Sequence, residues 1–256
     1  MNLLFSLGLD KFRKILEAVK AIGEVAAFEV NDDLARIREI DSWNVALVDC
    51  VLPKQCFIHY ECPSKSFFGL NVTKILPILK KFKGGLVELS VEDKAQLKVL
   101  PEGRPRNTRI FKFPVEKINQ DDLPLDINEK EFKFSHEVEV SSKAFLEALK
   151  HVEKIDDYVK LTVKSEELVF EAGDEEDIAA KIVIADPEDL TKVKTSVKGY
   201  AAAAKYNLKY LLETAKTATK LAKLMKLKLA TDYPICLQLD FPTNGVTKYW
   251  IAPYSG

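Results

Sequence analysis

The chain has 256 residues, of which 47% are hydrophobic and 30% are charged, and its formal net charge is −1. This composition is ordinary for a soluble globular protein with one large core or two smaller ones, and by itself it indicates no nucleic-acid partner. No apolar run approaches the roughly 18 residues that a membrane span needs. Met1–Asp10 lacks the basic and long apolar stretches of a signal peptide, so we expect it to form a strand of an intracellular protein.

Apolar periodicity divides the rest of the chain into helices and strands. Apolar residues at helical spacing predict four amphipathic helices, at Asp10–Ala21, Val72–Lys83, Ser142–Ile155 and Asn207–Lys220. Alternating apolar residues predict strands. In the first half the predicted strands are Val25–Val30, Leu34–Ile40, Val45–Leu52, Ser66–Leu70, Leu86–Val91, Ala95–Val99 and Thr108–Phe113. In the second half they are Phe132–Val140, Val159–Val163, Glu167–Glu171, Ile178–Ile184, Val197–Tyr206, Lys223–Leu229, Ile235–Phe241 and Val246–Ile251.

The two halves of the chain repeat each other. Phe12 recurs as Phe145, an offset of 133 residues, and the apolar residues around both have the same helical spacing. Further on, Asn71 recurs as Asn207, an offset of 136 residues, and Asn is a favourable N-cap at both places. Two similar α+β domains, each with antiparallel sheets and two helices on one face, satisfy this pattern.

A polar stretch, Val115–Glu131, separates the two halves. It contains Pro124 and shows no apolar period, which predicts an interdomain connecting loop. A structureless linker of this length is often functional. The predicted domains are therefore residues 1–114 and 132–256, joined by the loop 115–131.

Basic side chains concentrate on the four predicted helices. These windows carry net charges of +2, +4, +1 and +2, which leaves −10 for the remainder of the chain. Such a division attracts a polyanion to one side, and without a base-reading motif the contacts would be to phosphate. The alternative is that these side chains are simply solvated. The candidate residues for contact with the phosphates of a nucleic acid such as DNA are Lys11, Arg13, Lys14, Lys20, Lys74, Lys80, Lys81, Lys143, Lys150, Lys209 and Lys216.

Residues suited to catalysis or metal binding show no recognised spacing. The chain has no glycine-rich phosphate loop, and its histidines have no partner at a catalytic or metal spacing. The cysteines fit no common zinc pattern, so we expect free thiols at Cys50, Cys56, Cys62 and Cys236. The sequence therefore predicts no enzyme activity, no cofactor and no metal.

Three blocks of sequence resemble the proliferating cell nuclear antigen (PCNA) family of DNA sliding clamps, and the resemblance covers essentially the whole chain. The short tail after Pro253 is more similar to archaeal than to eukaryotic members. The blocks are Ile40-Asp41-Ser42 with Val45–Val48 and Leu52-Pro53, then Tyr206–Leu212, and finally Tyr233-Pro234-Ile235 with Val246–Pro253.

The resemblance implies the DNA clamp fold, in which three subunits close head to tail into a pseudo-sixfold ring with helices lining the hole. Such a ring is loaded around duplex DNA by a clamp loader and slides without reading sequence. It acts as a processivity factor and docking platform in DNA replication and repair. Its partners carry a PIP-box peptide, as in DNA polymerase, flap endonuclease and DNA ligase. The implied location is cytoplasmic, on the chromosome, in an archaeon, and nuclear in a eukaryote.

The resemblance also implies two protein-binding sites. The subunit interface would pair two edge strands, at Thr108, Ile110, Phe111, Ile178, Lys181 and Ile182. The partner-peptide pocket would comprise Ile40, Val45, Leu47, Leu123, Pro124, Leu125, Ile127, Pro234, Trp250, Ala252 and Pro253. The alternative for Ile40, Val45 and Leu47 is an ordinary place in a strand core.

Some alternatives stay open at the level of sequence. Pro77 should kink or shorten the second helix, so DNA contact by Lys80 and Lys81 does not follow from the helix alone. The near-neutral charge departs from the acidic balance usual in the family. A homotrimer and a specialised subunit that forms rings only with paralogues are both compatible with the sequence, and a DNA-processing enzyme with an unfamiliar site is a third alternative.

Overall fold

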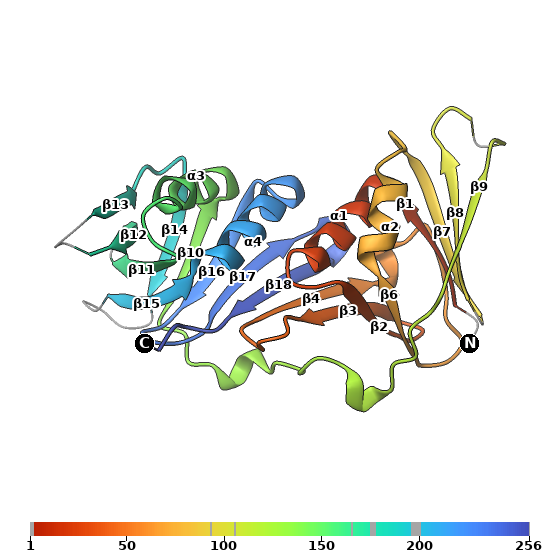
Figure 1. Ribbon diagram of the computed structural model, residues 1–256, viewed down its shortest axis with the longest axis horizontal. Coiled ribbons are helices and arrows are strands. Elements are labelled where there is room, and N and C mark those ends of the chain that lie inside the picture. The colour runs from red at the N-terminus through yellow and green to blue at the C-terminus, as the bar shows by residue number, and fades with distance from the viewer. Residues whose placement is uncertain are drawn as a thin grey trace. The chain divides into compact units, whose positions relative to one another are not determined.

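A computed structural model describes residues 3–92, 94–104, 106–164, 166–174, 178–195 and 201–255 (Figure 1). The chain divides into two compact units. The predicted domain limits would place residues 43–47 in the first unit and residues 241–247 in the second, but each segment belongs to the other unit. The domain limits themselves stay a prediction. Unit 1 comprises Met1–Ser42, Val48–Leu125 and Phe241–Thr247, and unit 2 comprises Trp43–Leu47, Asp126–Asp240 and Lys248–Gly256.

Unit 1 holds the first two helices and most of the first nine strands. These are β1 (Leu3–Gly8), α1 (Leu9–Lys20), β2 (Val25–Val30), β3 (Leu34–Ile40), β4 (Ala46–Pro53), β5 (His59–Glu61), β6 (Ser66–Asn71), α2 (Val72–Leu79), β7 (Gly85–Val91), β8 (Ala95–Pro101) and β9 (Arg109–Phe113). Its strands are hydrogen-bonded in the orders β5-β1-β7-β8-β9 and β4-β3-β2-β6. The register is antiparallel, as in the pairing of β7 with β8 and of β2 with β6.

Unit 2 repeats this arrangement with the second two helices. Its elements are β10 (His136–Ser141), α3 (Ser142–Val152), β11 (Tyr158–Lys164), β12 (Glu167–Gly173), β13 (Ala179–Ile184), β14 (Leu190–Thr195), β15 (Ala202–Asn207), α4 (Leu208–Leu221), β16 (Leu224–Leu229), β17 (Ile235–Asp240) and β18 (Val246–Ile251). The orders are β14-β10-β16-β17-β18 and β13-β12-β11-β15.

The internal repeat predicted from the sequence is confirmed strand by strand. Adding nine to each strand number of unit 1 gives the strand order of unit 2. The offset of 133 residues carries the start of β3 at Leu34 to the start of β12 at Glu167. The offset of 136 carries the start of α2 at Val72 to the start of α4 at Leu208. Each half is therefore one copy of the same α+β unit.

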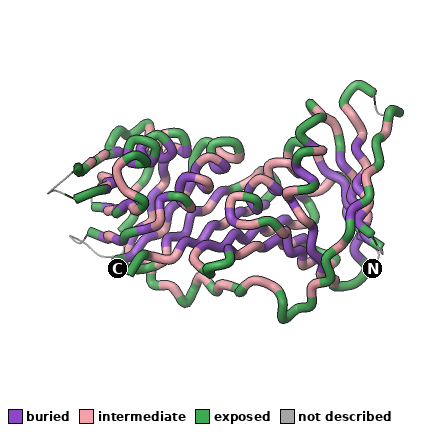
Figure 2. The backbone as a smooth tube through the Cα atoms, in the orientation of Figure 1, coloured by how far each residue is buried: buried purple, intermediate pink, exposed green. Residues whose placement is uncertain are grey.

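The core of each unit lies between its helices and its strands. In Figure 1 both helices of a unit lie on the same side of that unit's strands, and Figure 2 shows the strands as the most continuously buried part. In unit 1 the rings of Phe28 and Phe68 stack with centroids 4.7 Å apart. In unit 2 Phe145 of α3 meets Phe170 of β12 edge-on at 5.3 Å. Burial of these apolar rings stabilises each unit.

Helix ends follow local chemistry. Asn71 accepts a hydrogen bond from the Lys74 amide at the start of α2, and Asn207 caps α4 through the Lys209 amide. The predicted helix Val72–Lys83 is too long, because α2 ends at Leu79. Pro77 lies inside it and has no N–H to donate to the preceding turn, which accounts for the early end.

Two strand predictions need correction, and two strands were missed. The strand expected at Phe132–Val140 begins only at His136, because a 3-10 turn at Glu129–Glu131 precedes it. The strand expected at Val197–Tyr206 is β15, which begins at Ala202, and residues 196–200 lie outside the described part. Two strands were not predicted at all, β5 and β14, since neither has a clear apolar alternation.

Candidate functional surfaces

The predicted DNA-facing residues of unit 1 differ in how freely their charges are presented. Lys11 donates from Nζ to the Cys56 carbonyl at 3.0 Å, and Arg13 forms an ion pair with Asp10 at 2.6 Å. Lys80 reaches Glu17 of α1 at 3.2 Å. The other four, Lys14, Lys20, Lys74 and Lys81, are exposed or half-buried. Lys80 and Lys81 follow the end of α2 and so are not on the helix itself.

In unit 2 the corresponding side chains also differ in exposure and in their ion pairs. The Lys143 side chain is 81% exposed and lies 3.9 Å from Glu147. Lys216 donates to Glu213 at 2.8 Å, and this hydrogen bond raises the pKa of Lys216. Lys150 and Lys209 are exposed on α3 and α4. The helices of both units thus keep a positive balance, although contact of any one residue with DNA stays a prediction.

The residues predicted for the subunit interface lie on strands at the margins of their sheets. β9 is the last strand in the order β5-β1-β7-β8-β9, and β13 is the first in β13-β12-β11-β15. On β9, Ile110 is 55% exposed, and Phe111 packs edge-on against Phe82. Just before β13, Ile178 is 60% exposed. Exposed apolar side chains on unpaired strand edges are typical of strand-pairing interfaces.

The remaining interface candidates adjoin these two edges. Thr108 directly precedes β9 and is half-buried. On β13, Lys181 lies 3.3 Å from Glu171 of the neighbouring strand, and Ile182 is half-buried opposite Phe170.

The connecting segment, residues 115–131, is held to unit 1 at two points. Glu116 and Gly69 of β6 exchange backbone hydrogen bonds of 2.8 and 3.0 Å. A Cβ at Gly69 would come within 2.8 Å of the Ile118 side chain, so glycine permits this close approach. Further along, the Arg38 guanidinium donates to the Pro124 carbonyl at 2.7 Å. The first part of the connecting segment is therefore fixed to unit 1 by hydrogen bonds to its main chain.

The end of the connecting segment is held to unit 2 by charge. Glu129 accepts hydrogen bonds from Lys228 of β16 and Lys248 of β18. Burial alone would raise the pKa of Glu129, but these two hydrogen bonds outweigh it and lower the pKa. Asn128 caps the same short turn through the Lys130 amide. This double ion pair holds the end of the segment on the strands of unit 2.

Next to this ion pair, unit 2 carries an aromatic cluster of Phe132, Phe134, Tyr233 and Trp250. Phe132 lies 5.2 Å from Trp250 and 6.1 Å from Tyr233 between ring centroids. Phe134 stacks beside Phe132 at 5.9 Å. Tyr233 is 39% exposed, whereas Trp250 is 4% exposed. Only Trp250 was predicted as a pocket residue, although two aromatic residues directly after a linker were a signal for the cluster.

The predicted pocket residues fall in both units. Ile40, Leu123, Pro124 and Leu125 belong to unit 1, and Leu125 is 70% exposed. Leu47 is buried, which suits its alternative place in a strand core. The Ala252 amide donates to the Val45 carbonyl at 2.8 Å. That one pocket joins these residues stays a prediction. The candidates in unit 2 are Val45, Leu47, Ile127, Pro234, Trp250, Ala252 and Pro253.

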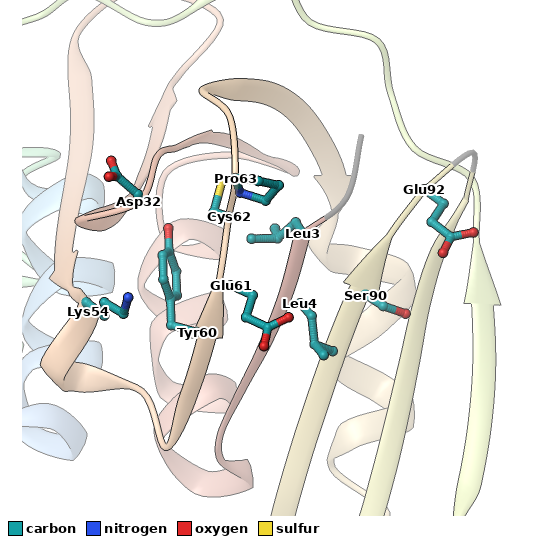
Figure 3. Close-up of a pocket in the computed structure, with 10 residues that line it drawn as sticks. All are labelled: Leu3, Leu4, Asp32, Lys54, Tyr60, Glu61, Cys62, Pro63, Ser90 and Glu92. Atoms are coloured by element: carbon teal, nitrogen blue, oxygen red, sulfur yellow. The ribbon is translucent and has the colours of Figure 1, made fainter.

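Unit 1 has an open cavity that is an alternative candidate for an active site (Figure 3). It has a volume of about 660 Å³ and lies beside β1 and β5. Its Tyr60 hydroxyl donates toward the Asn31 and Leu34 carbonyls, each at 2.7 Å. Burial raises the pKa of Tyr60 and that of the Cys62 thiol, which keeps both groups protonated and unreactive. The cavity therefore presents no activated nucleophile.

Three further features bear on function. Among the described residues, no group of three or more His, Cys, Asp or Glu side chains could hold a metal ion. All four cysteines are buried, and burial raises the pKa of Cys50 to about 12. In the same part of the chain, no helix has the length and apolar character to cross a membrane.

Comparisons with known proteins agree with one another. The family model of the PCNA N-terminal domain matches residues 9–122, and that of the PCNA C-terminal domain matches residues 126–254. A protein of Pyrobaculum aerophilum named DNA polymerase sliding clamp 1 is 26% identical over 250 residues, which cover 95% of this chain and 94% of that protein. A DNA polymerase sliding clamp of Thermococcus fumicolans is 25% identical and covers 96% and 95%.

Solved structures show the same fold. The PCNA structure from Thermococcus kodakaraensis superposes with a TM-score of 0.86 at 21% identity, covering 98% of this chain and all of the other. The structure from Entamoeba histolytica gives 0.84 at 20% identity and covers 98% of each chain. The DNA clamp fold predicted from the sequence is thus confirmed.

Proposed function

Because this chain belongs to the PCNA family, we propose that it is a subunit of a DNA sliding clamp. In this role it encircles duplex DNA as part of a trimeric ring, performs no chemistry of its own, and holds replication and repair proteins on the DNA. The observation that carries the proposal is the duplicated α+β unit, with positive helices on one side and unpaired strand edges at β9 and β13.

The internal repeat supports ring closure through these two edges. β9 is the counterpart of β18, and β13 is the counterpart of β4. Within unit 2, the Ala252 amide directly after β18 donates a hydrogen bond to the Val45 carbonyl directly before β4. The same relation between β9 of one subunit and β13 of the next generates a head-to-tail contact, and three such contacts close a ring.

Charge makes the two edges suited to each other. Residues 102–113 around β9 contain four basic side chains and one acidic, whereas residues 171–189 around β13 contain eight acidic and one basic. Pairing β9 with β13 joins opposite charges, and pairing either edge with itself joins like charges. This favours a ring built from copies of this chain over a subunit that needs paralogues.

The helices supply the DNA-facing side of the proposed ring. Contacts from flexible lysines to phosphates carry no sequence information, which suits a ring that must slide. The net positive charge falls on elements that share one side of the strands within each unit. The acidic remainder of the chain would face away from DNA.

The connecting segment supplies the apolar side chain for the proposed partner site. An exposed Leu125 beside acidic residues suits a PIP-box peptide that offers an apolar plug and basic flanks. A polymerase, flap endonuclease or ligase would dock through such a peptide, and a clamp loader would open the ring. The cell compartment would be the cytoplasm, on the chromosome, in an archaeal host.

Solution mass measured by light scattering after size exclusion tests the proposal. A closed homotrimer has about 87 kDa, three times the 28.9 kDa of one chain. A monomer at micromolar concentration that also fails to join any paralogue would contradict the ring. Retention of the trimer on closed circular DNA, and its release when the DNA is linearised, would then establish topological encirclement.

A further inference from the structure

Arg38 is a buried cation that joins its sheet to the connecting segment. It lies on β3, and its side chain is only 4% exposed. One guanidinium nitrogen, Nη2, donates to Glu29 Oε2 at 2.8 Å. The other, Nη1, donates to the Pro124 carbonyl at 2.7 Å. Burying an arginine side chain costs free energy unless its N–H donors form hydrogen bonds, so both contacts offset the cost of burying Arg38.

The Arg38 contacts form a chain that begins at the surface and ends on the connecting segment. Lys65, whose side chain is 49% exposed, pairs with Glu29 Oε1 at 2.8 Å. Glu29 of β2 thereby bridges Lys65 and Arg38. Arginine suits the inner position because its planar fork can hold a carboxylate and a carbonyl in fixed directions at once. The last acceptor in the chain is a main-chain carbonyl, not a side chain.

The Pro124 carbonyl lies in the part of the connecting segment that is predicted to bind a partner peptide. Pro124 lies between Leu123 and Leu125, two residues predicted to contact a partner peptide. Before it, the segment is tied to β6 at Glu116, and after it Glu129 is tied to unit 2. Leu125 is 70% exposed directly beside the anchored residue. Arg38 thus holds the backbone at the point where the apolar side chains are offered to solvent.

We propose that Arg38 is a positioning residue for the partner-peptide site. It acts through the Pro124 carbonyl, keeps the connecting segment in one conformation, and does not itself touch the peptide. This inference rests on the proposed function, since it concerns the same docking site. The peptide then meets a connecting segment that is already ordered, and binding does not have to supply the free energy of ordering that segment.

The physical consequence is a reduction in apparent affinity when the anchor is removed. If the segment visits several conformations, the peptide binds only the competent fraction, and the apparent Kd rises by the inverse of that fraction. A substitution at Arg38 should therefore weaken binding without removing any atom that contacts the peptide. The effect should be lost in a variant whose connecting segment no longer contributes to binding.

The test compares Arg38→Met with Arg36→Met in the full chain. Arg36 lies on the same strand and forms a two-pronged ion pair with Asp49 at 2.7 and 2.8 Å, so its loss is a matched disruption inside the sheet. Binding of a fluorescent PIP-box peptide is followed by anisotropy. We expect Arg38→Met to weaken binding about 5- to 30-fold and Arg36→Met to change it less than about twofold. Arg38→Lys, which keeps the charge but not the fork, should fall between them.

Two further readouts separate positioning from general destabilisation. In a double-mutant cycle, Arg38→Met should add little to a variant that carries Leu123→Ala, Leu125→Ala and Ile127→Ala, because the segment of that variant no longer contributes to binding. Hydrogen exchange without peptide should show faster exchange of the amides of residues 119–125 in Arg38→Met, by about fivefold or more, and unchanged exchange in β2 and β6.

Each outcome bears on the inference. Wild-type affinity in Arg38→Met, or effects of Arg38→Met and of the triple segment variant that simply add, would overturn it while leaving the proposed function intact. If wild-type protein binds no peptide, the proposed docking function fails and this inference fails with it. Faster exchange across the whole of unit 1 would show that Arg38 is only a fold-stabilising residue.

Discussion

The two units have the same strand order but carry different chemistry at equivalent positions. The apolar core positions recur, as Phe12 and Phe145 do, whereas some other positions change. Glu39 near the end of β3 corresponds to Ala172 in β12, and Pro77 in α2 corresponds to Glu213 in α4. The comparison teaches that the repeated apolar pattern determines the fold, and that the function of this chain has to be sought where the repeat is broken.

The second helices show the effect most plainly. α2 has 8 residues and contains Pro77, whereas α4 has 14 residues. After Pro77 the chain tightens, since the Lys81 and Phe82 amides bond to carbonyls three residues back. Three lysines expected on the helix, Lys80, Lys81 and Lys83, therefore follow it. Unit 2 presents the longer positive helix, and unit 1 gathers its charge at a helix end.

The largest expected effect comes from making the β9 edge acidic, which removes the charge difference between the two edges. Reversing Arg109 and Lys112 to Glu should convert the trimer to a monomer of 28.9 kDa, because β9 would then face the acidic β13 region with like charge. Light scattering measures the mass. Reversal of Lys192 and Lys194 on β14 is a control with equal charge change, and it should leave the trimer intact.

A mixing experiment shows whether the contact is head to tail. A second variant, Ile178→Lys with Ile182→Lys, blocks the β13 edge instead. Mixed with the β9 variant it should give a species of about 58 kDa, twice 28.9 kDa, because one good edge remains on each chain. A trimer that survives both variants would contradict the assigned interface.

Much of this architecture could be predicted from sequence because it rests on periodic apolar residues. The offsets of the repeat located all four helices, and Asn71 and Asn207 marked two helix starts. Two strands were not predicted. β5 has only three residues, and β14, Leu190–Thr195, is largely exposed and has no apolar alternation. Such marginal strands are formed by pairing with a neighbour, which no local pattern encodes.

The candidate site was less predictable for a related reason. Arg38 looks like any polar residue of a half-buried strand, and only the fold brings it to the Pro124 carbonyl. Glu129 forms ion pairs with Lys228 and Lys248, which lie 99 and 119 positions further along the chain. Phe132 was assigned to a strand, although it follows a 3-10 turn and packs on Trp250. Long-range contacts of this kind have no spacing rule.

The second prediction concerns the connecting segment, in which Leu123 belongs to unit 1 and Ile127 belongs to unit 2. Leu123→Ala with Ile127→Ala should weaken a PIP-box peptide by about 10- to 100-fold in calorimetry, since two apolar anchors are removed. The trimer should remain folded. Ile58→Ala removes an apolar side chain that is 65% exposed elsewhere in unit 1 and should leave affinity unchanged. Unchanged affinity in the double variant would exclude the segment from the site.

The third prediction concerns the helix charges that differ between the units. Reversal of Lys14, Lys81 and Lys216 to Glu should lower loading on primed DNA by about 3- to 10-fold and reduce the salt sensitivity of residence. Reversal of Lys94, Lys164 and Lys192, which are exposed outside the helices, gives the same net charge and is the control. Equal loss in both variants would mean that overall charge, and not the helix face, attracts DNA.

The smallest expected effect is a pH dependence at a position of the repeat that carries a carboxyl in unit 1 and none in unit 2. Burial raises the pKa of Glu39 from 4.5 to about 7, with the Val25 and Glu24 amides opposing the rise and the Glu116 and Glu24 carboxylates adding to it. The folded state therefore binds more protons than the unfolded state, so stability falls as the pH rises from 4.5 to about 7. At the equivalent place in unit 2, Ala172 is buried and has no charge.

Glu39→Gln should remove this dependence. Because glutamine stays neutral and can still accept from the two amides, the fall in Tm between about pH 5 and about pH 8 should shrink by about 2–4 °C. Differential scanning calorimetry measures it. Glu129→Gln is the opposite case, since the lowered pKa of Glu129 contributes stability that is lost as the pH falls. If Glu39→Gln and wild type show the same pH profile, the Glu39 carboxyl is ionised in the fold, and the two units differ at this position without any effect on stability.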